Sequence, residues 1–166
     1  LQTLSYRESV KSGEKDLHGM IDLAADLGFD GIDFEDRQFA STDAEYVEGI
    51  RLHALKRGLG IGYIGVIGAF GLKVHGDDEG HFRHICKWVD VCSQMQVPLI
   101  RVLGGQIPAG QTDESAWPWL AGWMRRVADY AQARRVLVGL YLFDQQSLST
   151  KLKEWPSTDL YRVNTL

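Results

Sequence analysis

Charged side chains that could do acid–base or binding chemistry lie after, or in one case within, short apolar stretches of this sequence. A carboxylate can act as a general acid or base when desolvation raises its pKa, and a buried arginine can hold a carboxylate through paired hydrogen bonds. The same residue types also form structural ion pairs and solvated loop carboxylates, so both interpretations stay open. The candidates are Arg7, Glu8, Glu35, Asp36, Arg37, His75, Asp77, Arg101 and Asp144.

Histidines and cysteines give weaker signals. His81 and His84 are three residues apart and lack the i, i+4 spacing and intervening glutamate of a zinc-protease helix, so we expect surface histidines. Cys86 and Cys92 are six residues apart on one predicted helix, on different faces. We expect both to be free thiols that pack as small hydrophobic side chains.

The elements that must position the candidates follow from the hydrophobic pattern. Short stretches rich in β-branched and aromatic residues predict five strands, at residues 4–6, 31–34, 61–67, 99–103 and 136–142. Between them, apolar residues at helical spacing predict four helices, around residues 17–27, 46–55, 82–92 and 120–131. Gly28 and Gly58 stand where the first two of these helices should end.

Alternating strands and helices force parallel strand pairing with right-handed connections. The sequence therefore predicts an open doubly wound sheet or a (β/α) barrel. A dinucleotide-binding sheet is disfavoured because no G-x-G-x-x-G follows the first apolar stretch, where the sequence is RESVKSGEKD. The segment GLGIGYIG, residues 58–65, leads into a strand, which favours a helix stop and a crowded strand over a phosphate-binding loop.

The composition is that of an ordinary soluble domain. The chain has 166 residues, 45% hydrophobic and 24% charged, with a formal net charge of −4. This length can bury one sizeable core. Because no run of lysine and arginine exceeds a pair, we expect neither nucleic acid nor a membrane as a partner. No signal peptide or spanning segment is visible, so a cytoplasmic location is expected.

Four phrases carry a family resemblance: IDLAADLGFDGIDFEDRQF (21–39), LKRGLGIGYIGV (55–66), WVDVCSQMQVPLIRVLGG (88–105) and VADYAQARRVLVGL (127–140). Together they resemble the sugar phosphate isomerase/epimerase family, the xylose-isomerase-like TIM barrels. The resemblance implies a partial (β/α) barrel of about five parallel strands with four flanking helices, truncated relative to a full eight-stranded barrel. The barrel is expected in residues 1–146. Residues 147–166 are expected to form a C-terminal tail that either seals a sheet edge or swaps between chains.

The sequence departs from this family in two ways. First, a closed barrel takes about 250 residues, whereas this chain has 166. In addition, strand five of the family usually ends in a metal-binding glutamate, and Tyr141 stands at the matching position, followed by Leu142 and Phe143. These side chains offer no hard anionic oxygen at neutral pH. The family would imply a divalent metal (Mg, Mn, Zn or Co), but with this ligand missing we predict no cofactor and loss of the metal-dependent sugar isomerisation.

The resemblance also places an acidic residue near the end of strand two and an arginine in the strand-four phrase RVLGG close to the sugar site. Glu35 and Arg101 are therefore the predicted catalytic residues. The alternative function is a weakly active metal-independent isomerase or epimerase, or a carbohydrate-binding protein, that uses this pair. A non-catalytic assembly without a substrate is a further alternative. Because a half-barrel leaves sheet edges and an inner face uncovered, we expect a homodimer that covers the open sheet, with a small sugar as ligand.

Overall fold

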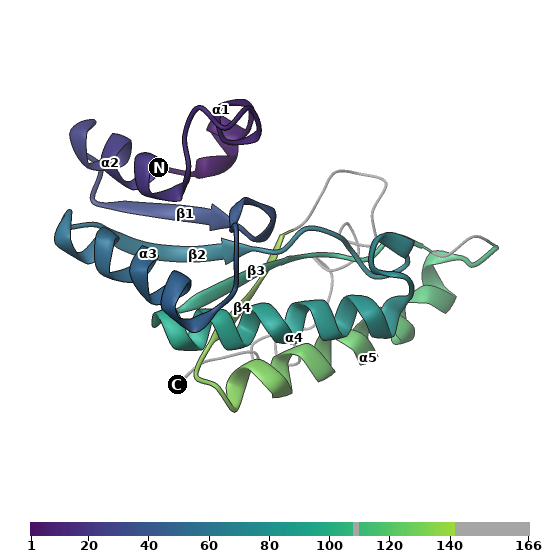
Figure 1. Ribbon diagram of the computed structural model, residues 1–166. Coiled ribbons are helices and arrows are strands. Elements are labelled where there is room, and N and C mark those ends of the chain that lie inside the picture. Colours follow the sequence, from purple (N-terminus) through teal and green to yellow (C-terminus); the bar gives the residue numbers. More distant parts are fainter. Residues whose placement is uncertain (108–109, 142–166) are drawn as a thin grey trace.

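The computed structural model describes residues 1–107 and 110–141 (Figure 1). Its strands are β1 (Gly31–Glu35), β2 (Gly60–Gly65), β3 (Leu99–Leu103) and β4 (Leu137–Tyr141). Its α-helices are α1 (Arg7–Lys11), α2 (Leu17–Asp26), α3 (Ala44–Lys56), α4 (Asp78–Met95) and α5 (Asp113–Gln132). Short 3-10 helices form at η1 (Thr3–Tyr6), η2 (Asp36–Gln38) and η3 (Lys73–His75).

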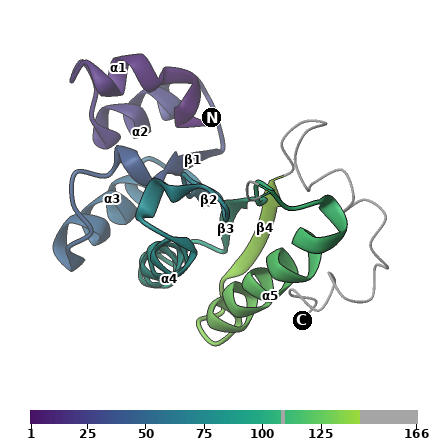
Figure 2. The same ribbon diagram turned by 90° about the vertical axis from the view of Figure 1, so that its right-hand side faces the viewer.

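The four strands form one parallel sheet in the order β1-β2-β3-β4, so each strand pairs with the next one along the chain. The helices α3, α4 and α5 follow one another around the outside of the curved sheet (Figure 2). This arrangement is the predicted partial barrel. The predicted tail at residues 147–166 lies outside the described residues.

The strand predicted at residues 4–6 is wrong, because this segment forms η1 and the described sheet has four strands instead of five. The residues just before it pair with β1, where Gln2 bridges Asp33 and the Asp33 N–H donates to the Leu1 carbonyl at 2.8 Å. The chain then coils, and the Ser5 N–H donates to the Gln2 carbonyl. A stretch of three residues is too short for its periodicity to separate a strand from a helical turn. The short helix α1 was also not predicted.

The four predicted helices are present because their apolar stripes pack against one face of the sheet. Asp16 starts α2 by accepting a hydrogen bond from Gly19 N, and Asp77 starts α4 in the same way from Gly80 N. Among residues 1–107 and 110–141, no helix is both long and apolar enough to span a bilayer. The core includes Leu17, Met20, Ile21, Phe34, Ile50, Ile64, Ile85, Val89, Ile100, Leu120 and Val127.

The opposite, concave face of the sheet has a different character. Side chains alternate along each strand, so Phe34, Ile64 and Ile100 are buried under the helices while their neighbours project to the inner face. The inner face is polar near β1 and more apolar toward β4, where Leu137 and Tyr141 are 43% and 48% exposed. Charged and aromatic residues, among them Glu35, Arg101 and Tyr63, occupy the β1–β3 part of this face.

Candidate functional site

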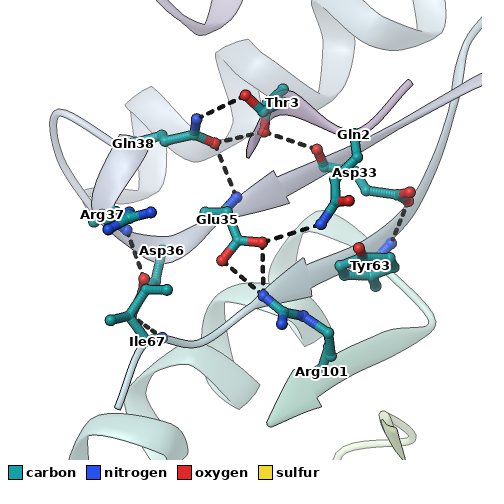
Figure 3. A network of polar contacts seen from close by, with 10 residues as sticks. All are labelled: Gln2, Thr3, Asp33, Glu35, Asp36, Arg37, Gln38, Tyr63, Ile67 and Arg101. Atoms are coloured by element: carbon teal, nitrogen blue, oxygen red, sulfur yellow. Dashed lines mark hydrogen bonds and ion pairs between the residues drawn. The ribbon is translucent and has the colours of Figure 1, made fainter. Parts of the chain in front are cut away.

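The inner face carries a buried ion pair at the carboxyl end of β1 (Figure 3). One guanidinium nitrogen of Arg101 lies 2.6 Å from Oε1 and 2.8 Å from Oε2 of Glu35. The Glu35 side chain is fully buried and that of Arg101 is 13% exposed. The structure thus brings together the two predicted catalytic residues, which are 66 residues apart in the sequence.

The strand register explains how this pair forms. Glu35 is opposite Gly65 of β2, and Gly65 is opposite Arg101 of β3, so the three residues lie in one row across the sheet. A Cβ atom at position 65 would lie 2.7 Å and 2.8 Å from the two carboxylate oxygens of Glu35. Only glycine leaves room for the two side chains to meet across β2.

Polar and aromatic groups surround the pair. Gln2 Nε2 donates to Glu35 Oε1 at 3.4 Å, and the Tyr63 N–H donates to the Asp33 carboxylate at 3.2 Å. The Arg101 guanidinium lies 5.8 Å from the ring centre of Tyr63 and 5.2 Å from that of Tyr141. Its Nε atom is buried and has no hydrogen-bond acceptor among the described residues. A buried donor without a partner is energetically costly.

The electrostatics of the cluster favour retention of protons. Burial raises the pKa of Glu35 above its usual value, although the Arg101 guanidinium and the Gln2 amide lower that pKa. Burial likewise raises the pKa of Asp33, opposed by its hydrogen bond from the Tyr63 backbone, and raises the pKa of the Tyr63 hydroxyl. A carboxyl group with a raised pKa is closer to the value at which it can exchange protons near neutral pH.

A second cluster lies just beyond the end of β1. The Asp36 side chain is 4% exposed, and its Oδ2 atom lies 2.7 Å from His84 Nε2 and accepts the Ile67 N–H at 3.1 Å. The ring of His75 stacks on His84 with centroids 3.9 Å apart, and on His81 at 5.3 Å. This cluster ties the β2–α4 connection to the end of β1.

The prediction of surface histidines is therefore wrong. His81 is 1% exposed, and neither of its ring nitrogens has a hydrogen-bond partner among the described residues. Burial, reinforced by His75 and His84, lowers the pKa of His81 to about 4. One signal could have revealed its position: His81 is four residues before buried Ile85, so it lies on the apolar stripe of α4.

The other predicted candidates are dispersed. Arg7 and Glu8 lie on α1 with their side chains 61% and 78% exposed, and Arg37 is exposed after β1. Asp77 caps α4, and Asp144 lies outside the described residues. None of these residues contacts the Glu35–Arg101 pair through a hydrogen bond or ion pair in the described part of the chain.

Both cysteines are buried free thiols, as predicted. Burial raises the pKa of Cys86 to about 11 and that of Cys92 to about 12. Because the thiolate is the reactive form, these side chains act as small hydrophobic groups and not as nucleophiles.

The donor set does not fit the divalent metal that the resemblance implies. Tyr141 belongs to the same inner face as Arg101, two residues beyond Gly139, which pairs with Arg101. It supplies a phenol where a carboxylate ligand is expected. In the second cluster, His75 Nε2 lies 3.0 Å from the Ile67 carbonyl oxygen and His84 Nε2 lies 2.7 Å from Asp36 Oδ2. Across residues 1–107 and 110–141, no three His, Cys, Asp or Glu side chains are arranged to hold a metal.

The family follows from a comparison with known protein families. Residues 21–147 match the model of the xylose isomerase-like TIM barrel. The chain belongs to this family. No curated protein matches the chain.

Solved structures of this fold are similar to the chain at low sequence identity. A xylose isomerase domain protein from Planctomyces limnophilus has a TM-score of 0.63 and 15% identity over 87% of this chain and 53% of its own. D-psicose 3-epimerase from Clostridium cellulolyticum H10, solved with D-tagatose, gives 0.66 and 17% over 80% and 49%. The 3-keto-D-glucoside 4-epimerase from E. coli gives 0.67 and 12% over 80% and 53%. The chain therefore spans about half the length of these three proteins.

Proposed function

We propose that this chain is a sugar-binding partial barrel that has lost the metal-dependent isomerisation of its family and binds its ligand through Arg101 on the inner face. The observation that carries the proposal is Tyr141. Its ring lies beside the Arg101 guanidinium on the inner face, at the strand position where the family resemblance places a metal-binding glutamate.

The chemistry of the inner face supports sugar binding. Sugar hydroxyls need charged or polar partners, and the Arg101 side chain, which is 13% exposed on the inner face, is a donor of this kind. The rings of Tyr63 and Tyr141 flank the same guanidinium and offer flat apolar surfaces for the C–H faces of a sugar. Glu35 is fully buried against Arg101, so its role is to position the guanidinium.

A titration with simple sugars tests this proposal. A panel of aldoses and ketoses is added to the chain while amide NMR shifts are followed, once with Mn²⁺ and once with EDTA. We expect weak, saturable shifts on β1–β4 that are the same in both buffers, and no isomerised product. The Arg101→Ala variant should bind the sugar at least about tenfold more weakly, since a hydrogen bond to a charged group is removed.

Arg125→Ala is the matched control because Arg125 is an exposed arginine on α5. Its response to sugars should equal that of the unmodified chain. Isomerisation that appears with Mn²⁺ and disappears with EDTA would overturn the loss of metal chemistry. A chain that shows no sugar-dependent shift at any concentration would overturn the binding site.

A further inference from the structure

A cavity separate from the inner face lies between α1 and the segment that follows β1. Its volume is about 690 Å³. Neither Glu35, Arg101 nor Tyr141 lines it, so it is distinct from the proposed sugar site. The lining residues are Arg7, Glu8, Val10 and Lys11 from α1, and Arg37, Gln38, Phe39 and Ala40 from the other wall.

The charges around this cavity are unbalanced. Three of the eight lining side chains are cations, Arg7, Lys11 and Arg37, and one is an anion, Glu8. Arg7 lies 3.5 Å from Glu8, but both side chains are largely exposed, so this pair is weak. Lys11 and Arg37 form no ion pair with any of the described residues. A net-acidic chain thus gathers an excess of two positive charges around one hollow.

The wall that carries Arg37 is held in place. Gln38 Oε1 accepts the Glu35 N–H at 3.1 Å and the Thr3 hydroxyl at 2.5 Å, and Gln38 Nε2 donates to the Thr3 carbonyl at 3.3 Å. These bonds fix η2 against the start of the chain. A pre-formed wall lowers the entropic cost of ordering a ligand against it.

We propose that this cavity binds the phosphate group of a small phosphorylated molecule. A guanidinium group offers a planar fork of donors that matches two phosphate oxygens, and a phosphate monoester carries nearly two negative charges, which suits an excess of two cations. The volume exceeds what a phosphate ion needs. Val10 and Phe39 provide apolar wall for the carbon skeleton attached to it.

The site does not rest on the proposed sugar site, because the two share no lining residue. The known ligand of the related Clostridium cellulolyticum epimerase structure is D-tagatose, an unphosphorylated sugar. A phosphate site is therefore not what that neighbour would suggest. It follows from the cations of this chain.

Amide NMR titrations of the full chain test the proposal. Inorganic phosphate, glucose 6-phosphate and glucose are added separately at constant ionic strength, with KCl as the salt control. We expect saturable shifts at α1 and residues 37–40 with both phosphate compounds, tighter binding of glucose 6-phosphate, and no shifts there with glucose or KCl. Equal affinity for the two phosphate compounds would overturn the organic part of the proposal.

Variants separate a built site from general charge attraction. Arg37→Ala should weaken phosphate binding about tenfold, and Arg37→Lys should weaken it less, because charge remains but the fork is lost. Glu8→Gln should strengthen it. Arg125→Ala removes the same charge from α5 and should leave the affinity unchanged.

An equal loss of affinity in Arg37→Ala and Arg125→Ala, or shifts scattered over the surface, would overturn the site. Because Arg37 is exposed, its removal should not unfold the chain. Lys11→Gln removes a second positive charge from the same cavity. Unchanged phosphate affinity in both Arg37→Ala and Lys11→Gln would also contradict the proposal. Failure of the sugar titration at Arg101 leaves these outcomes unaffected, so the two proposals are tested separately.

Discussion

Glu35 is stabilised inside the barrel wall almost entirely by one partner. Taking a carboxylate out of water is costly, and Arg101 offsets that cost through contacts of 2.6 and 2.8 Å. Gln2 adds only a long contact at 3.4 Å. Removing the guanidinium therefore has consequences for stability as well as for ligand binding.

We expect Arg101→Met to lower the free energy of unfolding by about 3–5 kcal/mol at neutral pH, because it leaves a buried carboxylate without compensation. The folded-state pKa of Glu35 is already raised, so the folded variant takes up a proton more readily than the unfolded chain, and the loss should shrink as the pH falls. Urea unfolding at pH 7 and pH 5 measures both effects.

The double variant Glu35→Gln, Arg101→Met should recover most of the stability, because no buried charge is then left without a partner. Equal instability of the single and double variants would show that the unpaired carboxylate is not the cause.

His81 predicts a second pH dependence of opposite sign. Its pKa falls from 6.5 to about 4 in the fold, because burial and the neighbouring His75 and His84 disfavour the imidazolium, partly opposed by Asp78 and Asp36. The unfolded chain therefore binds the proton first, and stability should decrease as the pH falls from about 6.5 to 4. A shift of this size corresponds to a loss of about 3 kcal/mol.

The His81→Leu variant should flatten this part of the stability profile, measured by thermal or urea unfolding between pH 7 and 4. It should also be at least as stable as the parent at neutral pH, since two unpartnered ring nitrogens are removed. His18→Leu on α2 serves as the control and should keep the slope. An unchanged slope in His81→Leu would show that other groups cause the acid sensitivity.

At the scale of elements, helix ends depend on backbone conformation. The end of α4 places Gln96 in the left-handed region with φ of 58°, where a side chain is strained and glycine is not. Glycine at this position removes the strain, but it also adds conformational entropy to the unfolded chain. We therefore expect Gln96→Gly to raise the free energy of unfolding by a net amount of up to about 1 kcal/mol. Lys87→Gly, at an exposed interior position of the same helix, should instead cost about 1 kcal/mol. If urea unfolding shows that both variants are destabilised, strain in the left-handed conformation of Gln96 is not the cause.

The sequence predicts most of these elements for clear physical reasons. The helices have long apolar stripes, and Gly28 and Gly58 end α2 and α3 with φ of 79° and 77°. The segment at residues 4–6 could not be assigned in the same way, because three residues carry too little periodicity and the contact that decides their conformation, Thr3 with Gln38, spans 35 residues.

The site was predicted in part. Glu35 and Arg101 came from the family resemblance, and the structure places them in contact. The pairing of Asp36 with His84 could not be predicted, because those residues lie on different elements and only the packing of α4 brings them together. The cavity beside α1 also escaped prediction, since α1 itself has only five residues and no apolar stripe.

At the scale of the whole molecule, the two sheet edges differ. The first residues of the chain cover part of the β1 edge through Leu1 and Gln2. The β4 edge has no second strand partner in the part of the chain that the structure describes, and Leu137 and Tyr141 are exposed beside it. Unpaired parallel edges tend to recruit another strand.

We therefore expect two copies of the chain to associate through β4, giving a particle of twice the 18.6 kDa chain mass in size-exclusion chromatography with light scattering. Leu137→Lys should shift this equilibrium toward the monomer. Leu55→Lys, at a 64% exposed position on α3, is the control and should not. A constant 18.6 kDa particle over a wide range of concentration would exclude the dimer.

The order of the strands also bears on how the chain folds during synthesis. Paired positions lie 30 residues apart for Glu35 and Gly65, 36 for Gly65 and Arg101, and 38 for Arg101 and Gly139. Each strand therefore emerges from the ribosome when its only earlier neighbour is already available, and closing each loop costs similar entropy. Until the next strand is made, the most recently made of the described strands therefore carries an unpaired edge.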